Sequence, residues 1–544
     1  MFFSFRTQGL RVAVLIASLL LASSVQMLAQ TPTKQWDRTF GGTDRDMPRA
    51  IQQTSDGGYI VGGSSVSSRN GDKSQDSQGE SDYWVLKLDA SGNKLWDRAF
   101  GGTLGDYLDE MQPTDDGGYI LAGNSNSNRS GDKSQDSRGD LDCWIVKLDA
   151  NGNKLWDRTI GGDRVDYLGV LQKTSDGGYI IGGPSYSGRS GDKSQDNRGD
   201  QDYWIVKLDA NGNKLWDRTF GGNRDDTLYD LKLTSDGGYI LGGTSLSDQS
   251  GEKSQNNQGG SDYWVVKLDA NGNKLWDRTI GSTGLDRLYV VQQDRDGGYI
   301  LGGSSEVTVD GDRTQPGRGG SDYWIVKLDA NGNKLWDRII GGSGNDELAD
   351  LQLSTDGGYL LGGNSSSDQS GEKSQNRRGG SDYWVVKLDA NRNKLWDYTF
   401  GGTQNDAFTT LQQTSDGGWI LSGASNSPLS GDKTQDGQGD YDYWIVKLSS
   451  ETVTGTASAI ASHTWSVYPN PARSNFILHL PEAVPHSSLH LSLLDATGHM
   501  VLTQSLTATG GDILVEVGQH PAGLYLLRVE GPNGILATQR LILQ

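Results

Sequence analysis

The sequence predicts an all-β protein in which a seven-bladed β-propeller precedes a small immunoglobulin-like β-sandwich. Three observations lead to this fold class. A unit of sixty residues is repeated seven times, each copy contains four short strand patterns, and the composition changes after the last copy. Repetition at such a period is interpreted first, because it decides the architecture of most of the chain.

Two series of tryptophans mark the period. The "WD" tryptophans recur every 60 residues from Trp36 to Trp396. A second series, in "DYW" or "DCW", recurs at the same spacing from Trp84 to Trp444. Fourteen of the 16 tryptophans belong to these series, so tryptophan is mainly a structural residue of the repeat.

Each copy predicts four strands. In one copy, "YWIVKLD" (Tyr203–Asp209) and "KLWDRTF" (Lys214–Phe220) flank the pair Asn211-Gly212, which is a strong hairpin signal. The segments "TLYDLKLT" (Thr227–Thr234) and "YILGGTS" (Tyr239–Ser245) flank "SDGG", a turn whose glycines tolerate positive φ. Apolar residues do not recur at helical spacing, so the repeats contain no predicted helix.

Four antiparallel strands, repeated seven times, predict a radial array of small sheets that bury their faces against one another. The ends of the array favour a closed ring. A lone "KQWDRTFGG" begins at Lys34, whereas the last copy ends with "DYWIVKLSS" at Ser450 and lacks its fourth strand. We expect these two segments to pair. An open β-solenoid is the alternative, but it would need terminal caps.

The repeat "DYWIVKLDANGNKLWDRTFGG", with Asp226 and "TSDGGYILGG" after it, resembles bacterial β-propeller repeats of the SBBP type from about Lys34 to Ser450. Its hairpin is also similar to the blades of quinoprotein dehydrogenases, over half a unit. That second resemblance would imply vicinal cysteines over the cofactor. The chain has one cysteine, Cys143, so we expect neither a quinone cofactor nor an internal disulfide.

The propeller offers few residues for catalysis. All six histidines follow the repeats, so none is available there for a triad or a zinc site. Each unit repeats four aspartates, which in one copy are Asp202, Asp217, Asp226 and Asp236. Seven equivalent copies favour turn capping and pairing with residues such as Lys207. We therefore expect no catalytic and no cofactor-binding residue. A secreted glycan-active hydrolase that uses propeller carboxylates is the alternative.

One loop has the spacing of calcium ligands. In "SGDKSQDSRGDLD", Asp132, Ser134 and Asp136 match the first, third and fifth positions of an EF-hand loop. The turn glycine is displaced to Gly139, and other copies replace the acids, for example with Pro316. We expect a polar loop and no metal site; calcium at some of the loops is the alternative.

The first 29 residues read as a signal peptide. Arg6 and Arg11 precede the apolar run "VAVLIASLLLA" (Val12–Ala22), and cleavage is expected after Ala29 or near Ser24. The mature protein should therefore leave the cytoplasm. The chain carries 49 basic and 69 acidic residues, a net charge of −20, which makes nucleic acid and anionic lipid poor partners.

A linker rich in Ser and Thr is predicted at residues 450–464, after the propeller at residues 30–449. Leucine becomes frequent in residues 465–544, and the pattern fits a small immunoglobulin-like sandwich. Six strands are predicted there: Phe476–Leu480, Leu489–Asp495, His499–Leu506, Ile513–Val517, Leu524–Glu530 and Thr538–Leu543.

The words "VYPNPA", "LLDATGHMV", "PAGLYLLRV" and "RLIL" in this segment resemble the type A C-terminal sorting domain of the type IX secretion system of Bacteroidota. The residues that carry the resemblance are Tyr468, Pro469, Asn470, Pro471, Gly498, Gly523, Tyr525 and Arg540. It implies Sec export, passage through the outer membrane by the type IX machinery, and removal of the domain by a sortase. The cargo is then released or attached to surface lipopolysaccharide.

These observations predict a monomeric, non-enzymatic binding or structural module at the cell surface or outside the cell. Its ligand is an extracellular glycan or protein that the sequence does not specify. The fifth unit departs most from the others, since "SSEVTVDGDRTQPGRGG" (Ser304–Gly320) loses acids and gains arginine. That departure favours a difference in binding.

Overall fold

The computed structural model describes residues 29–167, 169–306, 309–453, 466–468, 470–480, 488–495, 500–507, 511–518, 520–531 and 534–543. The signal peptide predicted up to residue 29 therefore lies almost entirely outside the described residues. The chain divides into a compact unit of residues 31–452 and a second unit that contains residues 453–544. Within the described ranges, no helix is long and apolar enough to cross a membrane.

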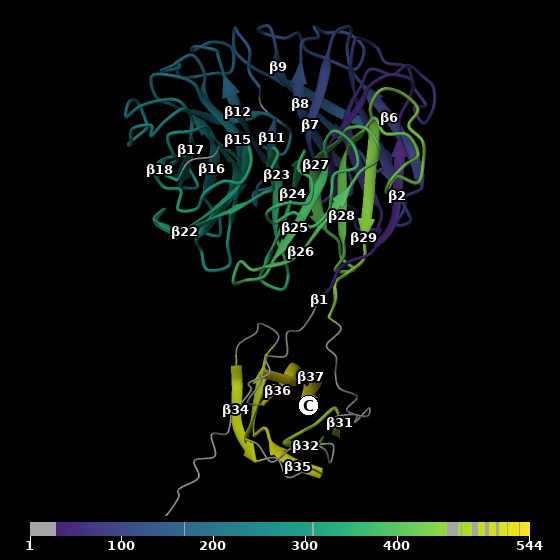
Figure 1. The fold of residues 1–544 in the computed structure, drawn as a ribbon, viewed down its shortest axis with the longest axis vertical. Coiled ribbons are helices and arrows are strands. Elements are labelled where there is room, and N and C mark those ends of the chain that lie inside the picture. Colours follow the sequence, from purple (N-terminus) through teal and green to yellow (C-terminus); the bar gives the residue numbers. More distant parts are fainter. Residues whose placement is uncertain are drawn as a thin grey trace, which may run out of the picture. The chain divides into compact units, whose positions relative to one another are not determined.

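The first unit is a seven-bladed β-propeller, as predicted, because its described residues form seven four-stranded antiparallel sheets arranged around an axis (Figure 1). The strands are given from the axis outwards. Blade 1 has β3 (Asp46–Gln53), β4 (Tyr59–Ser65), β5 (Asp82–Leu88) and β6 (Lys94–Phe100). Blade 2 has β7 (Asp106–Pro113), β8 (Tyr119–Ser125), β9 (Asp142–Leu148) and β10 (Lys154–Ile160). Blade 3 has β11 (Val170–Lys173), β12 (Tyr179–Ser185), β13 (Asp202–Leu208) and β14 (Lys214–Phe220).

The remaining blades follow the same order. Blade 4 has β15 (Asp226–Leu233), β16 (Tyr239–Ser245), β17 (Asp262–Leu268) and β18 (Lys274–Ile280). Blade 5 has β19 (Asp286–Gln293), β20 (Tyr299–Glu306), β21 (Ser321–Leu328) and β22 (Lys334–Ile340). Blade 6 has β23 (Asp346–Leu353), β24 (Tyr359–Ser365), β25 (Asp382–Leu388) and β26 (Lys394–Phe400). Blade 7 has β27 (Asp406–Gln413), β28 (Trp419–Ser425), β29 (Asp442–Leu448) and β2 (Lys34–Phe40).

The ring closes as expected. Strand β2, from the N-terminal side of the propeller, is the outer strand of blade 7 and pairs antiparallel with β29, with Arg38 opposite Ile445 and Phe40 opposite Tyr443. The open solenoid is therefore wrong. The blades do not coincide with the sequence unit that starts at Tyr203. Each sheet begins two strands later than that unit and takes its outer two strands from the next copy.

The repeated aromatic residues hold neighbouring blades together. Between blades 3 and 4, the ring of Tyr203 packs 4.7 Å from that of Trp264. The hydroxyl of Tyr203 donates to the backbone oxygen of Trp264 at 3.0 Å. Within blade 3, the indole N–H of the fully buried Trp204 donates to Asp217 at 3.1 Å. Cys143 is buried at the tyrosine position of blade 2, where it cannot make the hydroxyl contact.

The second unit contains two small antiparallel sheets. One orders β31 (Ser466–Tyr468), β32 (Asn475–Leu480) and β35 (Gly511–Glu516), and the other orders β34 (Met500–Thr507), β33 (Ser488–Leu494), β36 (Gly523–Gly531) and β37 (Gly534–Leu543). Both sheets contribute to one buried apolar cluster, which includes Phe476, Val515, Leu491 and Leu541. The predicted sandwich and its six strands are thus present, with β31 in addition. A separate two-stranded sheet joins β1 (Ala29–Gln30) and β30 (Thr452–Val453).

Candidate functional site

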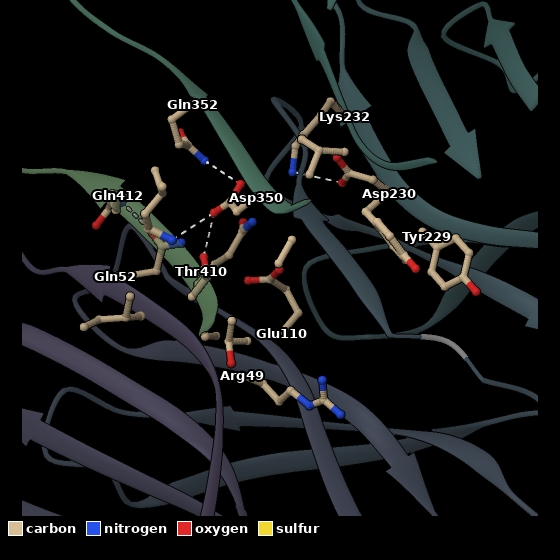
Figure 2. Close-up of a pocket in the computed structure, with 18 of the residues that line it drawn as sticks. Arg49, Gln52, Glu110, Tyr229, Asp230, Lys232, Asp350, Gln352, Thr410 and Gln412 are labelled. Atoms are coloured by element: carbon tan, nitrogen blue, oxygen red, sulfur yellow. Dashed lines mark hydrogen bonds and ion pairs between the residues drawn. The ribbon is translucent and has the colours of Figure 1, made fainter. Parts of the chain in front are cut away.

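The candidate site is the central channel of the propeller. It is lined by the innermost strands β3, β7, β11, β15, β19, β23 and β27 around a cavity of about 270 Å³ (Figure 2). Because these strands are the first of each blade, residues sixty apart in the sequence meet around one axis.

The seven copies differ strongly at two adjacent positions that line this channel. One position is occupied by Arg49, Asp109, Gly169, Tyr229, Tyr289, Ala349 and Thr409, and the next by Ala50, Glu110, Val170, Asp230, Val290, Asp350 and Thr410. The turn and tryptophan positions, by contrast, are nearly identical. Packing between blades restricts the buried positions, whereas a channel side chain meets only its neighbours around the axis. These residues were not predicted from the sequence, although an alignment of the seven copies would have marked the variable positions.

Three carboxylates and one lysine form the charged centre of the channel (Figure 2). Asp230 lies 3.0 Å from the ammonium group of Lys232. Its carboxylate also accepts from the backbone N–H of Leu231 at 2.8 Å and of Val291, in the next blade, at 3.0 Å. The strand register shifts at this point, between Leu228 and Asp230, so the acid satisfies N–H groups that the ladder does not use.

Asp350 repeats this arrangement two blades further on. It accepts from the backbone N–H of Leu351 at 2.7 Å and of Leu411 at 3.0 Å, and from the hydroxyl of Thr410 at 2.8 Å. Glu110 makes fewer contacts of this kind. Its carboxylate accepts from the backbone N–H of Met111 at 3.1 Å. Two of the three channel acids therefore bridge neighbouring inner strands, which is a structural role.

Burial shifts the protonation equilibria of this centre. It raises the pKa of Glu110 to about 7, although the charge of Lys232 acts in the opposite direction. Burial also raises the pKa of Asp350. For Lys232, burial lowers the pKa, but the charges of Asp230 and Glu110 outweigh it, so the pKa is raised. The lysine therefore stays charged and balances part of the acidic channel.

Glutamine side chains at a third repeat position form hydrogen bonds between neighbouring inner strands. Six blades carry Gln there and blade 4 carries Lys232: the glutamines are Gln52, Gln112, Gln172, Gln292, Gln352 and Gln412. The amide of Gln412 donates to Gln52 at 2.6 Å and accepts from the backbone N–H of Gln53 at 2.6 Å. Gln112 bridges blades 2 and 3 by donating to the backbone oxygen of Leu171 at 3.0 Å. These amides replace hydrogen bonds that a continuous sheet would have made.

The channel opens at one end into a wider cavity of about 910 Å³ between the first three blades. We call this cavity the channel mouth. Its lining includes Tyr107 and Tyr167, which are 42% and 47% exposed, together with Arg49, Asp109 and Asn124. A further cavity of about 460 Å³ is lined by residues of both the mouth and the channel, so the two are continuous.

Polar groups in the mouth lie beside its aromatic rings. The amide of Asn124 donates to Asp109 at 2.6 Å. Burial raises the pKa of Asp109 to about 6, against the opposing charge of Arg49. Further along the same side, Tyr229 is 42% exposed and packs edge-on against Tyr289 at 5.2 Å. Exposed tyrosines beside amides and carboxylates are typical of a surface that binds polar ligands.

The repeated aspartates have the structural roles expected of them. Asp236 caps its turn by accepting from the hydroxyl of Thr234 at 2.5 Å and the N–H of Gly238 at 3.0 Å, and it pairs with Lys267 at 2.9 Å. Asp217 accepts from the indole of Trp204. The lysine that pairs with each turn aspartate comes from the same blade. Lys207 therefore pairs with Asp176, at 2.8 Å, and not with Asp236.

The other two repeated aspartates, Asp202 and Asp226, are fully buried at a junction between blades. Burial, with a contribution from the charge of Asp226, raises the pKa of Asp202 to about 6. Burial also raises the pKa of Asp226. The same effect raises the pKa to about 6 for Asp82, Asp142, Asp382 and Asp442, and to about 7 for Asp262.

These buried acids predict a propeller that is most stable in mild acid. Their pKa in the folded state exceeds the unfolded value of 3.8, so between pH 3.8 and about 6 the native state binds more protons. We expect the melting temperature to rise by several degrees as pH falls from 8 to about 5. Below pH 3.8 stability should fall again, because acids such as Asp236, whose pKa hydrogen bonds lower to about 2, lose their partners.

Calorimetry over this pH range tests the prediction. Asp202→Asn removes one titrating group and should make the dependence shallower. A melting temperature that climbs steadily from pH 5 to pH 8 would contradict it.

The loop with calcium-like spacing is organised around a buried lysine. The ammonium group of Lys133 donates to Ser125 Oγ at 2.9 Å, to the backbone oxygen of Ser127 at 2.6 Å and to Ser137 Oγ at 2.8 Å. Asp136, one of the three residues with the spacing of calcium ligands, accepts a hydrogen bond from the backbone N–H of Arg129 at 2.9 Å. Within the described residues, no group of three or more His, Cys, Asp or Glu is arranged to hold a metal ion. That the loops bind no calcium stays a prediction.

Residues of the motifs that resemble a sorting domain lie next to β37, the last strand of the second unit. Asn470 Oδ1 accepts from the backbone N–H of Ile542 at 2.9 Å, and the N–H of Ala472 donates to the backbone oxygen of Ile542 at 2.8 Å. In β36, which begins at Gly523, the buried Tyr525 pairs with Leu541 and donates to the backbone oxygen of Pro521 at 2.8 Å.

The other predicted sorting residues take varied positions. Tyr468 ends β31, Pro471 is exposed, and Arg540 lies in β37. Pro469 and Gly498 lie outside the described residues. Residues of the motifs "VYPNPA", "PAGLYLLRV" and "RLIL", which are far apart in the sequence of this unit, therefore lie close together in the fold. Their role in sorting remains a prediction.

Comparison with known proteins confirms the sorting domain. Residues 466–544 match the family described as secretion system C-terminal sorting domain. The regulatory protein FlaEY of Caulobacter vibrioides is 25% identical over 421 residues, which are 68% of this chain and 43% of FlaEY. The chain thus spans less than half the length of that relative.

Two solved structures are also similar. PorZ, a surface component of the type IX secretion system of Porphyromonas gingivalis, aligns with a TM-score of 0.39 at 9% identity, over 94% of this chain and 61% of PorZ. The WD40 domain of Neurospora crassa Pan2 aligns with a TM-score of 0.42 at 9% identity, over 77% of this chain and 96% of that domain.

Proposed function

We propose that this chain, which its sorting domain directs through type IX secretion to the cell surface or the extracellular space, is a non-enzymatic binding module. Its ligand binds at the channel mouth. The observation that carries the proposal is the asymmetry of the inner strands, where otherwise near-identical repeats diverge. Divergence in the lining of an accessible cavity, beside buried positions that are nearly identical, is the pattern expected of a binding site on a repeated scaffold.

The residues of the mouth support an extracellular glycan or a protein segment as the ligand. Tyr107 and Tyr167 offer rigid rings with little entropy to lose on binding, and Asp109 and Asn124 offer fixed polar groups beside them. The acidic chain makes nucleic acid an unsuitable ligand. We propose that the propeller acts as a monomer.

A secreted hydrolase is the second candidate, favoured by the raised pKa of Glu110 and Asp109, about 7 and 6. A general acid needs such a pKa. One observation weighs against hydrolysis. The carboxylates of Asp230 and Asp350 already accept hydrogen bonds from backbone N–H groups of neighbouring inner strands, which is a structural role. A binding role therefore agrees better with the geometry.

For delivery, we propose that the N-terminal segment directs passage through the inner membrane by the Sec pathway. The type IX machinery recognises the C-terminal domain. A sortase then removes this domain, and the propeller is released or attached to lipopolysaccharide.

Arrays of extracellular glycans and peptides, probed with the full chain, test the binding proposal. We expect the double variant Tyr107→Ala/Tyr167→Ala to weaken binding to the best array hit by about 1 to 3 kcal/mol, roughly five- to 150-fold. Leu275→Ala, at a comparably exposed side chain of an outer strand, is the control and should leave binding unchanged.

Glycans on the array that bind should also be incubated with the protein and examined for cleavage. Cleavage that is lost in Glu110→Gln would overturn the non-enzymatic proposal in favour of the hydrolase. Equal binding by the double variant and the wild type would remove the mouth as the site.

A further inference from the structure

A second asymmetric cavity lies at the junction of blades 5 and 6, away from the channel. It has a volume of about 600 Å³, and its lining includes Pro316, Arg318, Arg338, Glu372 and Arg392. We call it the arginine groove. Strand β22 and the turn between β25 and β26 contribute to it (Figure 1). Asp337 also lines the groove, where it pairs with Lys334 at 2.9 Å.

Arg392 is the residue that sets this junction apart. The corresponding turn position is glycine in five other hairpins, at Gly92, Gly152, Gly212, Gly272 and Gly332. Arg392 keeps the turn, since its N–H donates to the backbone oxygen of Asp389 at 2.9 Å. It does so at a φ of 70°, the one positive φ of a non-glycine residue among those described. This conformation is strained for a residue other than glycine, so it persists only where the surrounding structure holds it.

The substitution displaces a neighbouring arginine. In five other blades the arginine after the "WD" word lies over its own tryptophan, at 5.3 to 5.6 Å from the ring centre. In blade 5 this position over Trp336 is taken by Arg392, at 5.0 Å. Arg338 turns instead to Glu372, with its Nη2 3.3 and 3.4 Å from the two carboxylate oxygens.

Charge accumulates in the groove as a result. Arg318 Nη1 also lies 3.3 Å from Glu372, so one carboxylate faces two arginines, with Arg392 beside them. At the junction of blades 6 and 7, by comparison, Arg378 pairs one-to-one with Asp432 at 2.5 Å. Pro316 further removes a polar side chain, because this loop position carries Asp or Asn in the other six copies.

We propose that the arginine groove binds a doubly charged tetrahedral oxyanion, namely a phosphate monoester or the free phosphate or sulfate dianion. Guanidinium groups hold the oxygens of such groups by paired hydrogen bonds. A ligand must compete with Glu372 for Arg318 and Arg338, which favours a dianion over a single carboxylate. In a chain of net charge −20, a local excess of arginine is the feature that would attract it.

Isothermal titration of the full chain at low ionic strength tests this site, with sodium sulfate, sodium phosphate, glucose 6-phosphate and glucose as probes. We expect the three anions to bind, glucose not to bind, and affinity to fall as salt is added. Tighter binding of glucose 6-phosphate than of free phosphate would identify a sugar ester as the natural source. Equal binding would identify the free anion.

The matched variant is Arg392→Gly, which restores the residue of the other hairpins and should melt at the wild-type temperature or above it. We expect it to weaken anion binding at least tenfold. Arg278→Ala, at the position of Arg338 in blade 4, is the control and should bind as the wild type does. Absence of anion binding by the wild type, or unchanged binding by Arg392→Gly, would overturn the proposal.

Discussion

A chain that lacks Thr33 to Phe40 is expected to melt at a far lower temperature than the wild type, or to aggregate. The deletion removes β2, the outer strand of blade 7, and exposes the edge of β29. It also removes the buried ring of Phe40, worth about 1.5 to 3 kcal/mol, and leaves the indole of Trp444 without Asp37, which costs about 1 to 3 kcal/mol.

These losses, together with the strand ladder, exceed about 5 kcal/mol, a large part of the roughly 5 to 15 kcal/mol that stabilises a typical domain. Thermal unfolding with light scattering measures the effect. The control is a chain in which residues 33–40 are moved to follow Ser450, because the strand can then form a hairpin with β29 and pair at the edge that β2 occupies in the wild type. It should regain most of the lost stability. An unchanged melting temperature after the simple deletion would contradict ring closure by β2.

The second large effect concerns export. A chain lacking Trp465 to Gln544 should disappear from the cell surface and the medium, and it should accumulate in the periplasm. The sorting domain occupies residues 466–544, and the repeats contain no similar words. The propeller forms a compact unit over residues 31–452, so it should fold without the tail. Fractionation and surface proteolysis in a type IX-competent host measure the loss.

The converse fusion provides the control. Residues 449–544, fused behind a signal peptide and an unrelated soluble protein, should carry that protein out of the cell. If the truncated propeller reaches the outside at wild-type levels, then the C-terminal domain is not the export signal.

Local features of the sequence were enough to determine the fold. Each Asn-Gly pair or "SDGG" turn acts within a few residues, and the alternation of apolar side chains acts within one strand. The count of copies and the spare strand at Lys34 then predicted seven blades and a closed ring. The sorting domain was predictable for a similar reason, since its words are contiguous and ordered.

The two candidate binding surfaces could be recognised only in the tertiary structure. Glu110, Asp230 and Asp350 belong to three different copies, and only closure of the ring brings them around one channel. The repeated aspartates were interpreted as structural because they occur at equivalent positions in all seven copies. The channel acids occupy one repeat position but occur there in only three of the seven copies, so they escaped that comparison.

The arginine groove shows the same limit at a single residue. Arg392 reads in the sequence as one exception among six hairpins, the other five of which carry glycine. Only the packed blades show that it covers Trp336 and turns Arg338 toward Glu372. Turn chemistry and strand patterns act between residues close in the chain, so the sequence reveals them. A cavity depends on side chains that the fold brings together from distant positions, and their contacts are decided only when the blades pack.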